Sequence, residues 1–260
     1  QFDDAKYSAE KERSVGLGVM GFHSYLQKHS IPLESVMSKA WNKKIFKHIQ
    51  EHVDQASKDL ADERGACPDA ADYGYNERFS NKTAIAPTAS ISIICGGASP
   101  GVEPVAANSY THKTLSGSFN VRNRYLVELL EKHGKNTDDV WSGITTNQGS
   151  VSHLDFLTDL EKDVFKTAFE LDQKWIIELS GDRTPYISQA QSINLFVPAD
   201  IHKRELHKIH FDAWKKGLKS LYYCRSKSIQ RAENVNDTKA TDVNANVYKS
   251  KPQTTEQPEY

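Results

Sequence analysis

Residues 83–104 are almost free of charge, although charged residues make up 26% of the whole chain. The segment reads Thr-Ala-Ile-Ala-Pro-Thr-Ala-Ser-Ile-Ser-Ile-Ile-Cys-Gly-Gly-Ala-Ser-Pro-Gly-Val-Glu-Pro, and Glu103 is its single charged residue. The β-branched residues predict a short buried strand. The glycines and prolines that follow predict a tight loop after it. A strand of this kind belongs in the interior of a protein whose other elements cover it.

Apolar residues recur at three- and four-residue steps over much of the remaining chain, and this spacing predicts helices. Short apolar runs predict two further strands, at residues 192–197 and 221–224. Gly16, Gly18 and Gly21 lie inside the first predicted helix. Because glycine is about 1 kcal/mol less favourable than alanine in a helix, they indicate close packing or a close backbone approach. Alternating helices and short strands predict an α/β fold, with helices at residues 8–28, 34–64, 121–133, 155–180 and 201–218.

The chain loses its core-forming residues beyond about Glu233, where Asn, Asp, Thr, Lys, Gln and Pro dominate. Segments of this composition do not bury enough apolar surface to fold. We therefore expect a folded domain over residues 1–232 and a flexible tail over residues 233–260.

Several classes of protein are excluded by composition. The chain has no run of 18 apolar residues, so no membrane span is expected. Its net charge of -1 gives no basic field for nucleic acid, and the lysines of residues 202–219 are expected to form a solvated helix face. Cys67, Cys95 and Cys224 lack metal-ligand spacing, so no metal site is expected, and the first two should be small buried residues. Without a secretion signal, we expect a cytoplasmic protein.

The loop Pro87-Thr88-Ala89-Ser90-Ile91-Ser92 is the first candidate binding site. A phosphate group needs several donors that converge on a small volume, and the hydroxyls of Thr88 and Ser90, together with the backbone amides near Ala89, can supply them. The alternative is a Ser/Thr-rich turn that satisfies its own backbone.

The other candidates are Glu103 and a pair of consecutive tyrosines, Tyr222 and Tyr223. A carboxylate in an otherwise uncharged segment can act as an acid, as a base or as a hydrogen-bond anchor, and the anchor is favoured. Adjacent tyrosines at a strand end are commonly one core ring and one surface ring. Alternatively, two phenols in contact can pass on a radical, because a phenol can lose a proton and an electron together.

Five short motifs together resemble the large, catalytic subunit of class I ribonucleotide reductase. They occur in the order of that family and extend from about residue 13 to residue 226. The matching residues are Gly16-Leu17-Gly18-Val19-Met20-Gly21-Phe22, Gly65-Ala66-Cys67-Pro68, Pro87-Thr88-Ala89-Ser90, Gly101-Val102-Glu103-Pro104 and Leu221-Tyr222-Tyr223.

The resemblance implies a fold and two sets of site residues. The fold would be the C-terminal half of a ten-stranded α/β barrel, with peripheral helices and a flexible C-terminal tail. The diphosphate of a ribonucleoside diphosphate would bind at Thr88, Ala89, Ser90 and Ile91. The radical would arrive at Tyr223, facing the small subunit, and pass to Tyr222, next to the active site. The product would be a deoxyribonucleotide for DNA synthesis.

The resemblance also implies partners. The radical would come from a metal-bearing small subunit, the electrons from thioredoxin or glutaredoxin, and this chain would bind no cofactor itself. The assembled large subunit would be an allosteric homodimer. The tyrosine pair favours class I over the adenosylcobalamin-dependent class, which does not need that relay.

One departure from the family pattern concerns the hydrogen-abstracting cysteine, which has Asn two residues before it and Glu two residues after it. Cys67, Cys95 and Cys224 all lack this pattern, and the family's redox cysteine pair and tail cysteines are also missing from these residues. The chain alone is therefore expected to be catalytically incomplete and to need an upstream part of the large subunit that carries the cysteine. The alternatives are a part of the adenosylcobalamin-dependent enzyme and a non-catalytic module that binds a phosphate or a partner.

Overall fold

The computed structural model describes residues 2–114 and 117–227 of the chain. The chain divides into a unit of residues 1–226 and a second unit of residues 227–260. The tail expected over residues 233–260 lies outside the described residues, and the fold below is that of the first unit.

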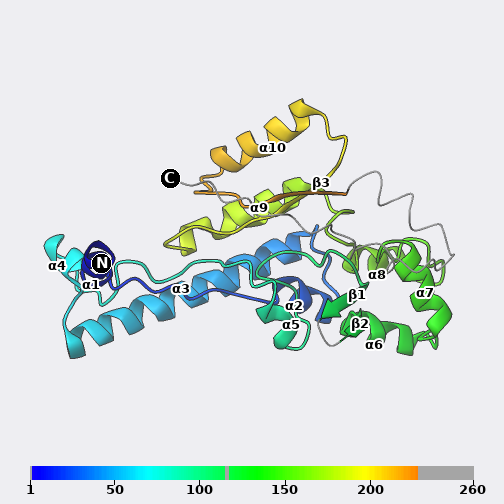
Figure 1. Ribbon diagram of the computed structural model, residues 1–260, viewed down its shortest axis with the longest axis horizontal. Helices are drawn as coiled ribbons and strands as arrows, with labels where there is room; N and C mark the ends of the chain where they lie inside the picture. The colour runs from blue at the N-terminus through cyan, green and yellow to red at the C-terminus, as the bar shows by residue number, and fades with distance from the viewer. Residues whose placement is uncertain (1, 115–116, 228–260) are drawn as a thin grey trace, which may run out of the picture. The chain divides into compact units, whose positions relative to one another are not determined.

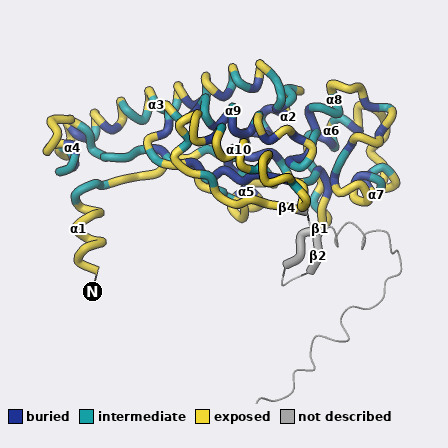
Figure 2. The backbone as a smooth tube through the Cα atoms, turned by 90° about the horizontal axis from the view of Figure 1, so that it is seen from above, coloured by how far each residue is buried: buried dark blue, intermediate teal, exposed yellow. Residues whose placement is uncertain are grey.

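The first predicted helix, residues 8–28, is wrong, because two helices flank an extended segment there (Figure 1). Helix α1 (Asp3–Glu12) buries none of its residues, and most of it is exposed in Figure 2. The chain leaves it at Arg13, where φ is 49°, and α2 (Phe22–Lys28) begins after Gly21, where φ is 83°. Between the two helices, Leu17 forms a parallel bridge with Thr83.

The glycines of this segment allow the close backbone approach that the sequence predicts. A Cβ atom on Gly18 would lie 2.7 Å from the carbonyl oxygen of Ala84, a distance that real Cβ atoms do not adopt. The amide of Leu17 donates to the carbonyl of Lys82 at 2.9 Å, and that of Ala84 to the carbonyl of Leu17 at 3.1 Å. Glycine is needed here because the two segments of the chain, around residues 17 and 83, pair through their backbones.

The long helix α3 (Val36–Arg64) confirms the helix predicted at residues 34–64. Ser35 caps its first turn by accepting from the Ser38 amide at 3.1 Å, and Gly65, with φ of 80°, ends it. The helix packs against α9 (Gln173–Arg183). The main apolar core lies where these two helices meet α2, and it includes Phe22, Leu26, Phe46, Ile85, Val102, Ile176, Leu179 and Ile193.

The helix predicted at residues 155–180 is also wrong, because α8 (Asp159–Val164) and α9 are separate helices. Thr158 and Glu161 form a capping box at the start of α8, and the Asp172 side chain caps α9. In the intervening loop, the Ala168 amide donates to the Val105 carbonyl at 2.8 Å. The loop buries apolar side chains at intervals that match helical spacing, which explains the error.

A hairpin lies before α6 (Arg124–Lys132) in the chain. Strands β1 (Ser109–Thr114) and β2 (Gly117–Arg122) pair antiparallel, and Asn123 then caps α6. The helix predicted at residues 121–133 therefore begins later than expected. A second core lies between α6, α7 (Asp138–Thr146) and α8, and it includes Leu126, Leu130, Trp141, Ile144, Leu154 and Val164.

The last elements form a small sheet covered by helices. Strands β3 (Leu195–Pro198) and β4 (Cys224–Lys227) are hydrogen-bonded neighbours, each starting about three residues after its predicted position. Helix α10 (Lys203–Lys215) connects them, inside the predicted range 201–218, and packs on α9. Ile85 also bridges Gln191 in parallel. Short helical turns complete the described residues, namely α4 (Pro68–Asp72), α5 (Ile91–Ile94) and η1 (Thr184–Tyr186).

The described part of the chain is therefore a mixed α/β structure, as predicted. Its regular strands form two two-stranded sheets, and Leu17–Thr83 and Ile85–Gln191 are isolated parallel bridges outside them. No helix in residues 2–114 and 117–227 is long and apolar enough to cross a membrane.

Candidate functional site

The predicted phosphate loop leaves the core directly after Ile85 and turns sharply at Thr88, where φ is 50°. The Thr88 hydroxyl accepts a hydrogen bond from the Gly101 amide at 2.7 Å. The Thr88 carbonyl accepts from the Ser92 amide at 2.9 Å. Because a hydroxyl has one proton and two lone pairs, Thr88 can still donate while it holds Gly101.

The other three predicted contact residues, Ala89, Ser90 and Ile91, are exposed. Ser90 is the N-cap residue of α5, yet its side chain makes no capping hydrogen bond. The Ser92 hydroxyl, by contrast, is buried and donates to the Ala89 carbonyl at 3.1 Å. The loop therefore turns on the internal bonds of Thr88 and Ser92, and the Ser90 hydroxyl is not part of them.

The loop of residues 99–103 lies against the phosphate loop and against the start of α2. Gly101 has φ of 50°, and a Cβ there would lie 2.9 Å from the Ala86 carbonyl oxygen, so only glycine fits. Ser24 and Ser99 exchange hydrogen bonds, since each hydroxyl accepts from the other residue's amide, at 2.8 and 3.1 Å. These contacts fix the loop that carries Glu103.

Glu103 is the hydrogen-bond anchor that the sequence favours. Its side chain is 4% exposed, its Oε1 accepts from the Asn194 amide at 2.8 Å, and its Oε2 accepts from the Asn194 side-chain Nδ2 at 3.0 Å. Burial raises the pKa of Glu103, while the two hydrogen bonds from Asn194 and the charge of Arg225 oppose that rise.

Tyr222 and Tyr223 lie side by side directly before β4 (Cys224–Lys227). Their ring centroids are 4.1 Å apart at an interplanar angle of 57°, and the rings are 49% and 55% exposed. The arrangement of one core ring and one surface ring is therefore wrong for this pair. A side-chain hydrogen bond with Tyr223 raises the pKa of Tyr222, and the Arg225 guanidinium lies 5.6 Å from the Tyr223 ring centroid.

Asn194 connects Glu103 with the tyrosines, and the sequence reasoning did not identify it. Its Oδ1 accepts from the Tyr223 amide at 3.1 Å, while its two N–H groups bind Glu103. The available signal was an amide between two buried aliphatic residues, Ile193 and Leu195. Buried polar side chains need partners, but a sequence does not say which partner an asparagine has.

The cysteines give no sign of forming a site. Cys67 is buried, as predicted. The prediction for Cys95 is wrong, because this residue is exposed at the C-terminal end of the four-residue helix α5. Cys224 is also exposed. Within the described ranges, no group of three or more His, Cys, Asp or Glu side chains could hold a metal ion.

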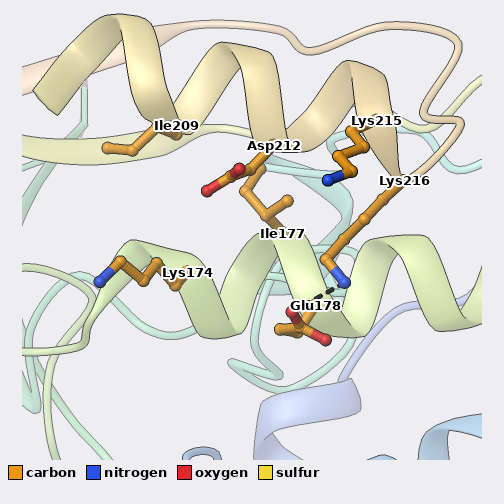
Figure 3. A pocket seen from close by; sticks show the side chains of 7 residues that line it. All are labelled: Lys174, Ile177, Glu178, Ile209, Asp212, Lys215 and Lys216. Atoms are coloured by element: carbon orange, nitrogen blue, oxygen red, sulfur yellow. Dashed lines mark ion pairs between the residues drawn. The ribbon is translucent and has the colours of Figure 1, made fainter. Parts of the chain in front are cut away.

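A separate groove of about 390 Å³ lies between α9 and α10 (Figure 3). Lys216 forms an ion pair with Glu178 across it at 2.7 Å. The groove contains none of the predicted site residues. Its lining consists of Lys174, Ile177, Glu178, Ile209, Asp212, Lys215 and Lys216.

Comparison with known proteins identifies the family. A family model described as the ribonucleotide reductase barrel domain matches residues 1–77 and 69–224. The chain belongs to this family, and the resemblance drawn from its motifs is confirmed.

Three relatives show how much of such proteins the chain represents. The large subunit of ribonucleoside-diphosphate reductase from Invertebrate iridescent virus 6 is 50% identical over 232 residues, which cover 88% of this chain and 24% of that protein. Its counterpart from Invertebrate iridescent virus 3 is 45% identical, covering 91% and 38%. The solved Actinobacillus ureae class Id ribonucleotide reductase alpha subunit has a TM-score of 0.81 at 39% identity, covering 89% and 42%. The chain therefore spans less than half the length of these relatives.

Proposed function

We propose that this chain is the part of a class I ribonucleoside-diphosphate reductase large subunit that binds the substrate diphosphate and completes radical transfer. The observation that carries the proposal is the contact between Tyr222 and Tyr223, whose half-exposed rings lie 4.1 Å apart between centroids. The two side chains are also hydrogen-bonded to each other, and phenols in that contact can exchange a hydrogen atom, whereas two rings that serve only the core are buried.

The proposed step moves one proton and one electron at a time. A radical generated in a metal-bearing small subunit oxidises the Tyr223 phenol to a phenoxyl radical. Tyr222 then gives its hydroxyl hydrogen to Tyr223, which becomes a phenol again while Tyr222 becomes the radical. Tyr222 finally takes a hydrogen atom from a cysteine thiol elsewhere in the large subunit. The resulting thiyl radical starts reduction of the ribose, for which thioredoxin or glutaredoxin supplies two electrons and the 2′-oxygen leaves as water.

The phosphate loop is proposed to hold the diphosphate of the ribonucleotide during this chemistry. Ala89, Ser90 and Ile91 are exposed, and the Ser90 hydroxyl makes no capping bond to α5. Thr88 keeps a hydroxyl proton while it accepts from Gly101. Oxygen and nitrogen donors on a turn with small side chains suit a phosphate group.

The whole enzyme is proposed to contain further parts. The described strands would join an upstream part of the large subunit to form the ten-stranded barrel, and that part would carry the hydrogen-abstracting cysteine. We propose that the large subunit is a cytoplasmic, allosterically regulated homodimer and that the radical-generating small subunit is its partner.

The test is replacement of each tyrosine by phenylalanine in the whole large subunit, assayed with the small subunit and a reductant. Phenylalanine keeps the ring and removes only the hydroxyl. A hydroxyl that makes one ordinary hydrogen bond contributes about 0.5–1.5 kcal/mol, about a tenfold effect at most. Loss of the relay should instead lower turnover at least about a thousandfold, or about 4 kcal/mol in activation free energy.

Thermal unfolding and diphosphate affinity of the two variants serve as controls, and both should match the unmodified enzyme. If Tyr222→Phe and Tyr223→Phe both keep more than about a tenth of normal turnover, the pair has a structural role. The adenosylcobalamin-dependent enzyme or a non-catalytic binding module would then explain the site better.

A further inference from the structure

We propose that Glu103 is a positioning residue for the tyrosine pair, acting through Asn194 on the backbone of Tyr223. The inference rests on the proposed radical-transfer function. It assigns a specific task to a buried carboxylate whose hydrogen bonds go to Asn194.

The hydrogen bonds among these three residues leave Asn194 one orientation. Its backbone amide and Nδ2 both donate to the Glu103 carboxylate, at 2.8 and 3.0 Å. Its Oδ1 is thereby directed to the Tyr223 amide, which donates at 3.1 Å. Glu103 and Asn194 are 4% and 3% exposed, so water does not replace a lost partner. Hydrogen bonds to a charged acceptor in such surroundings are strong, and unpaired groups are costly.

The tyrosines depend on these bonds because their rings are not held by the core. Both rings are about half-exposed, so their position is set by the backbone of residues 222–223. That backbone is bound by residues 193–195: the Tyr222 amide donates to the Ile193 carbonyl at 2.8 Å, and the Leu195 amide donates to the Tyr223 carbonyl at 2.9 Å. Asn194 lies at the centre of this contact. A displacement of about 1 Å at a reacting group can lower a rate about a hundredfold.

Glu103 is itself fixed relative to the phosphate loop. The Glu103 amide donates to the Pro100 carbonyl at 3.0 Å, and the Gly101 amide donates to the Thr88 hydroxyl at 2.7 Å. The 99–103 loop therefore connects the turn proposed to bind the substrate diphosphate with Asn194, which binds the backbone of Tyr223. Substrate and radical donor are in this way positioned by one short piece of chain.

The experiment is carried out in the whole large subunit. It exchanges the hydrogen-bond donor and acceptor between the side chains of residues 103 and 194. In Glu103→Gln, one donor faces a donor whichever way the new amide is turned, because both Asn194 groups that face position 103 are N–H groups. In Asn194→Asp, two carboxylates face each other. The double variant Glu103→Gln/Asn194→Asp restores a complementary set, because the new amide donates to the new carboxylate and still accepts from the backbone amide.

We expect each single variant to lower kcat about a hundredfold with cytidine diphosphate as substrate and to leave its dissociation constant within about threefold. The double variant should recover kcat to within about tenfold of the unmodified enzyme. With 3-fluorotyrosine at position 223, the ¹⁹F resonance should shift or broaden in the single variants and return in the double variant. A role in general stability would not move this signal selectively.

Gln173→Glu is the matched control. Gln173 is buried and its Oε1 accepts from the Phe196 amide at 2.8 Å, so the change alters another buried amide that binds β3 but leaves the hydrogen bonds of Asn194 with Glu103 and Tyr223 in place. It should lower the thermal midpoint without lowering kcat more than about threefold.

Two results would overturn the proposal: single variants that fold and keep kcat within about threefold, or a double variant that folds but remains a hundredfold impaired. If the single variants do not fold, the kcat and ¹⁹F signal of the double variant decide by the same limits. Failure of the proposed function itself would be recognised separately, because Tyr222→Phe and Tyr223→Phe would then both keep more than about a tenth of normal turnover. The ¹⁹F measurement would still report whether Glu103 positions residue 223.

Discussion

His23 shows how a single buried side chain makes the stability of this fold depend on pH. It lies on α2, is 1% exposed, and its Nδ1 accepts from the Val105 amide at 3.1 Å. Burial lowers the pKa of His23 to about 3, because the charged imidazolium would lose its hydration. The neutral ring therefore connects α2 to the chain that follows Glu103.

Acid should destabilise the protein through this residue. Between the ordinary histidine pKa of about 6.5 and about 3, the unfolded chain binds a proton that the folded chain does not. The contribution of His23 is fully present above pH 6.5 and is lost as the pH falls toward 3, by up to about 1.4 kcal/mol per pH unit. His23→Asn keeps an acceptor for Val105 and removes the titration. The free energy of unfolding, measured with urea at several pH values, should depend less on pH in the variant than in the unmodified protein. An equal dependence on pH would contradict the assignment.

Ser90 allows the phosphate loop to be tested by the loss of one hydroxyl. A hydrogen bond to a charged group contributes about 1.5–3 kcal/mol, so Ser90→Ala should raise the dissociation constant of a ribonucleoside diphosphate about ten- to a hundredfold. Ser90→Leu should do the same or more by filling the turn. Calorimetry on the whole large subunit measures both, with the exposed Ser142→Ala as control. Unchanged affinity in the Ser90 variants would mean that the loop is only a turn.

At the scale of elements, pairing between backbones overrides local preference. The segment of residues 13–21 has apolar residues at helical spacing, yet it is extended and bound to residues 81–84. The amide of Val15 donates to the Asn81 carbonyl, and that of Leu17 to the Lys82 carbonyl, both at 2.9 Å. Because three glycines make a helix here unfavourable, few other contacts are needed to select the extended form.

Two neighbouring glycines provide a matched test of this element. An added Cβ on Gly18 would lie 2.7 Å from the Ala84 carbonyl oxygen, whereas one on Gly16 would make an ordinary contact of 3.4 Å with the Ala84 Cβ. Gly18→Ala should therefore lower the free energy of unfolding by about 1–3 kcal/mol, as overpacking does. Gly16→Ala should change it by less than about 0.5 kcal/mol. If the segment were helical, both changes would instead stabilise the protein by up to about 1 kcal/mol, so denaturant unfolding separates the two structures.

At the scale of the whole molecule, the two larger of the three apolar cores in the described residues lie among different helices. One lies between α2, α3 and α9, and the other between α6, α7 and α8. Amide side chains join them: Asn123 donates to Gln27 and to Asn108, and Asn108 donates to the Phe165 carbonyl at 2.7 Å. Because these amide side chains are hydrogen-bonded to one another, they fix the position of residues 108–165 relative to α2.

The chain should need the rest of a large subunit for activity. It spans 24% of one relative and 38% of another, and none of its cysteines has the Asn-x-Cys-x-Glu pattern. We expect the 260 residues alone to reduce no ribonucleotide, because the hydrogen-abstracting thiol is missing. A polypeptide that supplies this thiol, together with a small subunit and a reductant, should restore turnover in a deoxyribonucleotide assay. Turnover by these residues alone would show that the missing cysteine is wrongly assigned.

The sequence by itself determined the features that depend on neighbouring residues. The helix predicted over residues 34–64 ends where the sequence places Gly65, because capping is a contact within one turn. The exposed loop at Ala89 and Ser90 follows from small and turn-forming residues, and the adjacent tyrosines are visible in the chain itself. Such signals need no knowledge of what lies across the core.

Only the tertiary structure decided the features that depend on distant residues. Apolar spacing reports burial, not conformation, so it predicted one helix over residues 155–180 where a buried loop separates α8 from α9. It could not indicate that Gly18 lies against Ala84 or that Asn194 binds Glu103, 91 residues earlier in the chain. A buried polar group requires a partner, but folding selects that partner from the whole chain, because the hydrogen bond forms only when both segments have packed.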